Sequence, residues 1–215
     1  MQNKYADHRL KLIMNEINSY DNVLDIGCVE HDLEMTKKNL WLHQHIVNKA
    51  AYVLGIDILE SEIKILNEYG YNVAVADAEN FLFKKNFDVI VAGELIEHLS
   101  NPGAFLDCCR KNLKENGKLI LTTPNVWYYQ FYTSMLLKSK INSLNIEHTC
   151  WYDKKTISQL LERHGFKAIK IEFVIPNKYQ RGYHISKVIY NLNLKYLGGE
   201  SIFIVAKMDD LLPKK

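Results

Sequence analysis

The chain has 215 residues, a hydrophobic content of 47% and a formal net charge of +2. A chain of this size and composition can bury one continuous core, which predicts a single domain over residues 1–215 and argues against a disordered or fibrous protein. No apolar run reaches the length of a membrane span, and charged residues interrupt the N-terminal segment, so we expect a cytoplasmic protein without a secretion signal.

The N-terminal segment is predicted to be an amphipathic helix. Its apolar residues recur at the i, i+3, i+4, i+7 spacing of one helical face. They are Leu10, Ile13, Met14 and Ile17. We expect this helix to lie on the domain with that face buried.

Seven short apolar runs follow, and each is predicted to be a buried strand. In chain order they read "NVLDI", "AYVLGID", "NVAVAD", "FDVIVAG", "GKLILTTP", "KAIKIEFVI" and "ESIFIVAK". Helical stretches at 31–47, 60–69 and 102–115 lie between the first five strands. This alternation predicts βαβ units and a parallel sheet covered by helices on both faces.

Local signals mark some of the helix boundaries. Asn101-Pro102 is typical of a helix start, and Gly117 is the expected stop of that helix. A further helix, "KKTISQLLERHGF", precedes the sixth strand, and a long connection leads to the seventh.

Three of the predicted strands end in a carboxylate. Asp25 closes the first strand, Asp57 the second and Asp77 the third. Because the carboxyl ends of parallel strands form the crevice where α/β sheets bind ligands, we expect these three side chains to converge on one ligand. The turn after Asp25 also presents backbone N–H groups to a polar or anionic group.

With these features, the chain resembles the class I S-adenosylmethionine-dependent methyltransferases from Val23 to Lys207. The stretches that carry the resemblance are "VLDIGC", "GIDI", "ADAENF" and "FDVIVAGELIEHLSNPGAFLDCCRKNLKENGKLILTTPN". The resemblance implies an α/β, Rossmann-like three-layer sandwich whose seven-stranded, mostly parallel sheet has the order 3-2-1-4-5-7-6, with strand seven antiparallel. It also implies S-adenosyl-L-methionine as the cofactor.

The resemblance further implies which residues hold that cofactor. The first strand's turn would lie beside the methionine part, the second strand's end would bind the ribose hydroxyls, the third strand's end would hold the adenine, and the fourth strand's end would line the far wall. The full set is Asp25, Gly27, Cys28, Asp57, Ile58, Asp77, Ala78, Gly93 and Glu94. A purely structural alternative makes Asp25 a helix cap and Asp77 an ordinary loop carboxylate.

The turn departs from the family's glycine-rich pattern, because only Gly27 is kept and Val29 and His31 stand where further glycines are usual. A β-branched residue forced to a positive φ loses roughly 1–2 kcal/mol. A turn with negative φ at Val29 avoids this cost. We therefore expect Val29→Gly to leave cofactor binding intact or to improve it.

Two histidines are the predicted acid/base residues, His98 after the fourth strand and His148 after the fifth. Each has an alternative interpretation as a hydrogen-bonded structural histidine. Glu94, Glu97 and His98, with the downstream His148, also resemble the metal-binding set of small-RNA 2′-O-methyltransferases, and their i, i+3, i+4 spacing would place the first three on one helical face. The "EHL" pattern also occurs in methyltransferases without a metal, and we expect no metal here.

The remaining candidate ligand residues are interpreted as ordinary. Free thiols in a reducing compartment are expected for Cys28, Cys108, Cys109 and Cys150, whose spacing suits neither a metal site nor a disulfide framework. His43 and His45 stand two residues apart on different helical faces, and we expect both on the solvated surface.

Two aromatic-rich segments are predicted acceptor-side or lid insertions, around residues 125–152 and 176–199. The chain is acidic before them and basic from them onward: residues 1–124 hold 13 Lys or Arg against 18 Asp or Glu, and residues 125–215 hold 14 against 7. This asymmetry indicates either an ordinary basic surface or a region that meets an anionic small-molecule acceptor. It lacks the dense basic stripe typical of nucleic-acid binding.

We therefore expect a methyltransferase that acts on an oxygen or nitrogen of a small, phosphate-bearing acceptor, such as a nucleotide-linked sugar or another precursor in glycan biosynthesis. One alternative is an RNA 2′-O-methyltransferase with a metal at the ExxEH site. Another is a non-catalytic regulatory protein that keeps the fold and binds the cofactor. The oligomeric state does not follow from the sequence.

Overall fold

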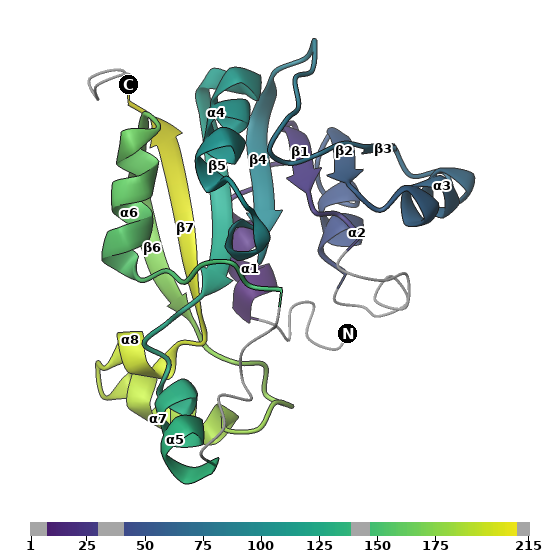
Figure 1. Cartoon of the computed structure of the whole chain (residues 1–215). Coiled ribbons are helices and arrows are strands. Elements are labelled where there is room, and N and C mark those ends of the chain that lie inside the picture. The colour runs from purple at the N-terminus through teal and green to yellow at the C-terminus, as the bar shows by residue number, and fades with distance from the viewer. Residues whose placement is uncertain (1–7, 30–40, 139–146, 210–215) are drawn as a thin grey trace.

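The computed structural model describes residues 8–29, 41–138 and 147–209, and they form a twisted seven-stranded sheet with helices packed on it (Figure 1). The strands are β1 (Asn22–Ile26), β2 (Tyr52–Asp57), β3 (Val73–Val75), β4 (Phe87–Gly93), β5 (Leu113–Pro124), β6 (Phe166–Val174) and β7 (Ser201–Met208). The helices are α1 (His8–Asn15), α2 (Leu42–Val47), α3 (Glu60–Glu68), α4 (Pro102–Asn112), α5 (Tyr129–Lys138), α6 (Lys154–Arg163), α7 (Tyr183–Asn191) and α8 (Lys195–Gly198). None of these helices is long and apolar enough to cross a bilayer.

The strand order is β3-β2-β1-β4-β5-β7-β6, which confirms the predicted order. The pairs among β1 to β5 are parallel, and β7 is antiparallel to both of its neighbours, as expected. In Figure 1 the arrows of β1, β2 and β4 accordingly point the same way and the arrow of β7 points the opposite way. The carboxyl ends of β1 to β5 therefore share one edge of the sheet, called the carboxyl edge below.

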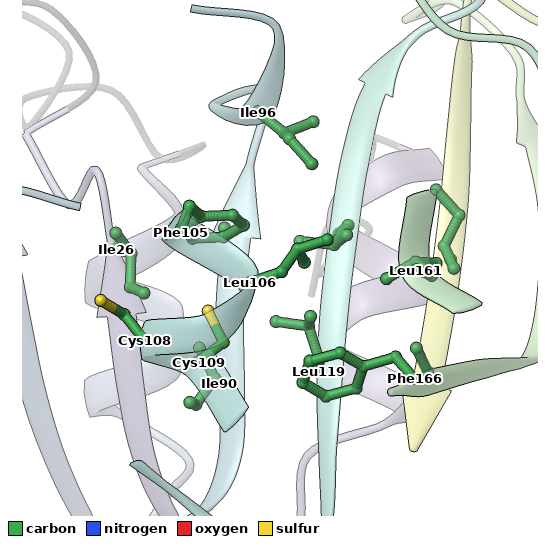
Figure 2. Packing of buried hydrophobic residues seen from close by; sticks show 14 of the residues in the cluster. Ile26, Ile90, Ile96, Phe105, Leu106, Cys108, Cys109, Leu119, Leu161 and Phe166 are labelled. Atoms are coloured by element: carbon green, nitrogen blue, oxygen red, sulfur yellow. The ribbon is translucent and has the colours of Figure 1, made fainter. Parts of the chain in front are cut away.

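The core forms on both faces of the sheet because the central strands are apolar on both sides. In β4, Ile90 packs in the cluster that contains Phe105 of α4 and Leu161 of α6, whereas Val89 and Val91 pack in the cluster that contains α1. Successive side chains of a strand point to opposite faces, so a continuous apolar run suits a strand buried on both. Figure 2 shows the first of these clusters.

Helix α1 confirms the predicted amphipathic helix, because its apolar face is buried in the second cluster. The predicted start of α4 is also confirmed: the Asn101 side chain accepts a hydrogen bond from the Ala104 N–H at 3.0 Å, and Pro102 occupies the first turn. Helix α3 lies within the predicted 60–69 segment. Of the helix expected at 31–47, residues 31–40 lie outside the described residues, and α2 forms the remainder.

The expected helix end at Gly117 is wrong, because α4 ends at Asn112 and β5 begins at the next residue. The buried Asn112 amide accepts a hydrogen bond from the Phe83 N–H at 2.7 Å and donates to the Cys108 carbonyl at 2.8 Å. Leu113 then pairs with Phe87 of β4, ahead of an irregularity in the register. A long-range strand pairing thus overrides the local polar sequence that follows.

Three helices gather beyond the carboxyl edge, below β5 and β7 in Figure 1. They are α5, α7 and α8, and we call the segments that hold them, residues 125–138 and 175–199, the carboxyl-edge lobe. The hydroxyls of Tyr128 and Ser186 join the two segments at 2.9 Å, and the Gln130 amide donates to the Arg181 carbonyl at 2.8 Å. The buried Asn125 amide donates to the carbonyls of Tyr196 and Gly199.

Candidate functional site

The turn after β1 is closed by hydrogen bonds to β2. The N–H groups of Gly27 and Cys28 both donate to the Ile56 carbonyl, at 2.8 and 3.2 Å. Gly27 has φ +79°, and a Cβ there would lie 3.4 Å from Leu95, which is an ordinary contact. The backbone conformation, rather than lack of space, is therefore what favours glycine at this position.

Val29 is a structural member of this turn. It is not among the described residues with positive φ, which confirms the expected negative φ. Its side chain is fully buried with Trp41 and Ile63, and its N–H donates to the Asp57 carboxylate at 3.1 Å. Glycine here would leave a cavity, so the benign effect expected for Val29→Gly does not extend to stability. His31 lies outside the described residues.

Asp57 connects the turns that follow β1 and β2. Its two oxygens accept hydrogen bonds from the N–H groups of Val29 and Leu59, at 3.1 and 3.2 Å. The side chain is half-buried, and a carboxylate has about four acceptor sites, so it retains capacity for a ligand hydroxyl. The exposed side chain of Ile58 stands next to it in the chain.

Asp77 follows β3 on the same edge. The Asp57 carbonyl accepts a hydrogen bond from the Ala76 N–H at 3.0 Å, which places the two acidic tips at the ends of neighbouring strands. The exposed Asp77 carboxylate also accepts from the Glu79 N–H at 2.8 Å, and Ala78 between them is half-buried. The tips of β1, β2 and β3 are thus neighbours, but of the three carboxylates expected to converge on one ligand only those of Asp57 and Asp77 are accessible at this edge, because Asp25 is buried.

Asp25 differs from the other two carboxylates because it points inward. It is buried and hydrogen-bonded to the equally buried His43 at 2.8 Å, so the expectation of a solvated His43 is wrong. Gly55 makes the space: a Cβ there would lie 2.6 Å from the His43 ring and 2.8 Å from the Cys28 sulfur. Asp25 therefore supports the turn from below by holding α2 against β1, and Cys28 is a packing residue.

The end of β4 forms the wall of the candidate site that faces the turns after β1 and β2. Gly93 ends the strand, and Glu94 follows with φ +52° while its N–H donates to the Thr122 carbonyl at 2.9 Å. One Glu94 carboxylate oxygen accepts from the Ser201 hydroxyl at 3.4 Å. The other oxygen is buried and has no hydrogen-bond partner among the described residues.

Among the acidic residues near this wall, Glu97 has the most strongly shifted pKa. It is buried, and one carboxylate oxygen accepts a hydrogen bond from Thr123 Oγ1 at 2.9 Å. Its other oxygen has no hydrogen-bond partner within the part of the chain that the structure describes. Burial raises the pKa of this carboxyl to about 8, and the nearby Glu94 carboxylate adds to the rise. Glu97 therefore carries a proton at neutral pH.

Glu97, His98 and His148 come together although the last is distant in sequence. One ligand atom from each lies within 4.8 Å of the others. The Thr149 N–H donates to the Glu97 carbonyl at 2.8 Å and so holds the second segment against the first. Glu94 is not part of this group, because residues 96–98 form a single 3-10 turn and not the helix that would align Glu94 with Glu97 and His98.

Aromatic rings continue the wall from the histidines toward the lobe. The rings of His98 and His148 lie 4.8 Å apart, His148 contacts Trp151 at 5.9 Å, and Trp151 contacts Phe131 of α5 at 5.5 Å. Trp127 faces a cavity of about 510 Å³ instead. That cavity is lined by Trp127, Asp153, Lys154, Lys155, Ser158, Phe173 and Tyr196.

Two contributors to the site were missed from the sequence. Thr123 contacts Glu97, and its only sequence signal is its place at the tip of a predicted strand. His43 contacts Asp25, and no local signal indicates this because the two residues belong to different elements.

Comparison with known proteins gives a consistent result. Residues 1–171 match the family described as "Methyltransferase domain". The human mitochondrial ubiquinone biosynthesis O-methyltransferase is 24% identical over 189 residues, which cover 81% of this chain and 48% of that protein. The malonyl-[acyl-carrier protein] O-methyltransferase of Haemophilus influenzae is 30% identical over 107 residues, covering 49% and 38%. The chain thus spans about half the length of the first of these two relatives and a smaller share of the second.

Among solved structures, a SAM-dependent methyltransferase from Archaeoglobus fulgidus aligns with a TM-score of 0.62 and 24% identity. The alignment covers 93% of this chain and 91% of that one. This likeness shows a common fold.

Proposed function

We infer that this chain, which belongs to the methyltransferase domain family, transfers a methyl group from S-adenosylmethionine to a hydroxyl oxygen of a small acceptor. The observation that carries the inference is the grouping of Glu97 and His98, in the connection after β4, with His148. The Leu95 side chain of that connection lies against Gly27, in the turn that is hydrogen-bonded to Asp57 through Val29. The two histidines can accept a proton from the acceptor, and the Gly27 turn with Asp57 fits a nucleoside.

The residues around the Gly27 turn fit the cofactor. Gly27, which the positive φ of this position favours, leaves this point of the turn without a side chain, and the spare acceptor sites of Asp57 suit ribose hydroxyls. We assign the adenine to Ile58, Asp77 and Ala78. When bound, the sulfonium supplies an activated methyl group.

Gly93 and Glu94 complete the cofactor site on the β4 side, opposite the turn. Asp25 and Cys28 act from beneath, because both are buried. They determine where the turn lies and do not touch the ligand.

The histidines are the proposed bases. A hydroxyl must lose its proton as its oxygen bonds to the methyl carbon and the carbon–sulfur bond breaks, so a base within hydrogen-bond reach assists the reaction. His98 or His148 takes that proton at neutral pH. Protonated Glu97 cannot compete for the proton, but it can donate a hydrogen bond from its buried carboxyl.

Two observations support an oxygen acceptor with an anionic group. Both named relatives are O-methyltransferases. The cavity beside Trp127 combines aromatic walls with Lys154 and Lys155, and its one carboxylate, Asp153, is already bonded to Trp127 and Thr156. This lining suits a ring that carries a phosphate or carboxylate. A nucleotide-linked sugar or glycan precursor has this chemistry, and so do phosphorylated phenols.

Calorimetry and a turnover assay test the proposal together. S-adenosylmethionine should bind the wild type, and Asp57→Asn should weaken binding about tenfold or more because a charge-assisted hydrogen bond is lost. His98→Gln and His148→Gln should keep that affinity and lose methyl transfer to the acceptor that the wild type uses. His164→Gln, on a histidine at the end of α6, is the matched control. Absence of cofactor binding by the wild type would refute the proposal.

A metal-dependent RNA 2′-O-methyltransferase is the second candidate, because Glu97, His98 and His148 offer one carboxylate oxygen and two imidazoles. Such donors suit a first-row divalent metal. Equilibrium dialysis with Mn²⁺ separates the candidates: stoichiometric binding lost in His98→Gln, with turnover of a short RNA, favours the second. Cofactor binding without turnover of any acceptor favours the regulatory alternative.

A further inference from the structure

Helix α7 turns an apolar stripe outward. Ile185, Val188 and Leu192 recur at i, i+3 and i+7, and all three are exposed. On the opposite side, the buried Ser186 bonds to Tyr128. A surface helix normally directs its apolar stripe to the core, whereas no part of the chain that the structure describes buries this one, so it is a candidate contact surface.

Helix α5 adds to the exposed apolar surface of the same lobe. Leu136 and Leu137 are 78% and 84% exposed. The start of α5 is fastened to the entry of α7, because the Tyr129 hydroxyl donates to the Gly182 carbonyl at 3.3 Å and Gln130 bonds to Arg181. Figure 1 shows α5 and α7 together below the sheet.

The lobe is also purely basic. Its two segments, 125–138 and 175–199, contain no Asp or Glu, although the chain has 25 of them. They contain five basic residues: Lys138, Lys178, Arg181, Lys187 and Lys195. Segments that contain basic but no acidic residues, together with exposed aliphatic side chains, combine the two attractions that hold a helix at an anionic lipid surface.

We propose that the carboxyl-edge lobe docks on an anionic phospholipid bilayer. In this arrangement α7 lies along the surface, its stripe of Ile185, Val188 and Leu192 enters the interface, and Lys187 and Lys195 contact headgroup phosphates. The energy comes from apolar area removed from water and from charge attraction, so binding requires both.

Other occupants fit less well. Nucleic acid would use the lysines but would leave the aliphatic stripe in water, since its backbone is bound by charged and polar groups. A second copy placed on the same face by twofold symmetry would bring two sets of basic segments without acidic residues together, which costs energy through like-charge repulsion.

Docking would bring the bilayer to the edge that holds the candidate site. Asn125, which anchors the lobe through Tyr196 and Gly199, is two residues from Thr123, the partner of Glu97. Resting on the proposed function, this placement favours an acceptor hydroxyl on an amphiphile at the lipid surface. Docking is measured without any acceptor, so the failure of either proposal can be distinguished.

Vesicle flotation with the full chain is the test. The wild type should bind phosphatidylcholine vesicles that contain about 30% phosphatidylglycerol, should not bind pure phosphatidylcholine, and should be released at about 0.5 M NaCl. The double variant Ile185→Ser/Val188→Ser should lower partitioning about tenfold or more. Leu82→Ser, at a leucine outside the lobe that is 72% exposed, should have no effect.

Charge is tested separately. Lys187→Gln/Lys195→Gln should lower partitioning about tenfold, whereas Lys64→Gln/Lys111→Gln, with the same net charge, should not. Circular dichroism checks that each variant is folded. The proposal is overturned if the wild type does not bind anionic vesicles, or if the serine variant binds them as well as the wild type does. It is also overturned if the serine substitutions dissociate a solution dimer instead of lowering vesicle binding. Equal binding of RNA by the wild type and the serine variant would then favour a nucleic-acid partner.

Discussion

Gly27 and Gly70 allow backbone strain to be separated from ligand contact. Both have positive φ, and a Cβ at Gly70 would meet nothing within 4 Å. Gly27→Ala and Gly70→Ala should each lower the free energy of unfolding by about 1–2 kcal/mol, measured in urea. Only Gly27→Ala should also weaken cofactor binding in calorimetry, because only that turn approaches the ligand. Equal affinities in the two variants would contradict the assignment of the turn.

Glu97 should make stability depend on pH. Its pKa rises from a model-peptide value of 4.5 in the unfolded chain to about 8 in the fold. Between these values the folded state holds a proton that the unfolded state has lost, so the free energy of unfolding falls as pH increases from about 4.5 to 8. Urea unfolding at a series of pH values, in EDTA, should show this decline.

The matched variants are Glu97→Gln and Glu115→Gln, the latter at an exposed position. The first should flatten the dependence between pH 5 and 8, because glutamine does not ionise. The second should keep the wild-type curve. A wild-type curve that rises through this range after correction for the other groups would mean that Glu97 is ionised in the fold.

At the scale of single residues, sequence reasoning reached the site only partly. His98 and His148 were predicted from their places after the fourth and fifth strands, and the structure brings them together through Thr149, which no spacing reveals. His43 was misplaced because its burial depends on Asp25 and on the missing side chain of Gly55. Contacts between elements decide such cases, and local periodicity carries no information about them.

Helix α2 is held to β1 by the His43–Asp25 pair, which gives a prediction at the scale of elements. His43→Ala or Asp25→Ala leaves one buried polar group without its partner and should cost about 3 kcal/mol of unfolding free energy. The double variant should cost less than the sum of the two. Additive costs in urea unfolding would show that the two side chains stabilise the fold independently.

Elements with a continuous apolar run were predictable to within a residue or so. Strands β1 and β4 have the expected bounds, since Val23 to Ile26 and Phe87 to Ala92 are almost wholly buried. The start of β5 was not, because "LKENG" is polar and pairs through Leu113 alone with Phe87. Long-range register, which a local pattern does not contain, fixed that boundary.

Asn125 joins the lobe to the sheet and gives a prediction for the whole molecule. Asn125→Ala would leave the carbonyls of Tyr196 and Gly199 without a donor and should cost about 2–4 kcal/mol. Limited proteolysis should then cleave the lobe before the sheet. Asn116→Ala, at an exposed residue of β5, is the control and should leave the cleavage pattern unchanged.

The topology of the molecule followed from alternating elements and a family resemblance, and the structure confirmed it. The arrangement of the lobe did not follow, although its segments were predicted as insertions. Its packing depends on pairs such as Tyr128 with Ser186 and Gln130 with Arg181, which join segments about fifty residues apart. Their action as a lid remains a prediction.

Glu94 illustrates a trade-off between robustness and chemistry. A glutamate at φ +52° costs about 1–2 kcal/mol that glycine would avoid. Glu94→Gly should therefore raise the melting temperature, yet it would also remove the charge that helps keep Glu97 protonated. A more heat-resistant but catalytically poorer variant is the expected result. It would mean that the carboxylate at the end of β4 is kept at a cost in thermal stability.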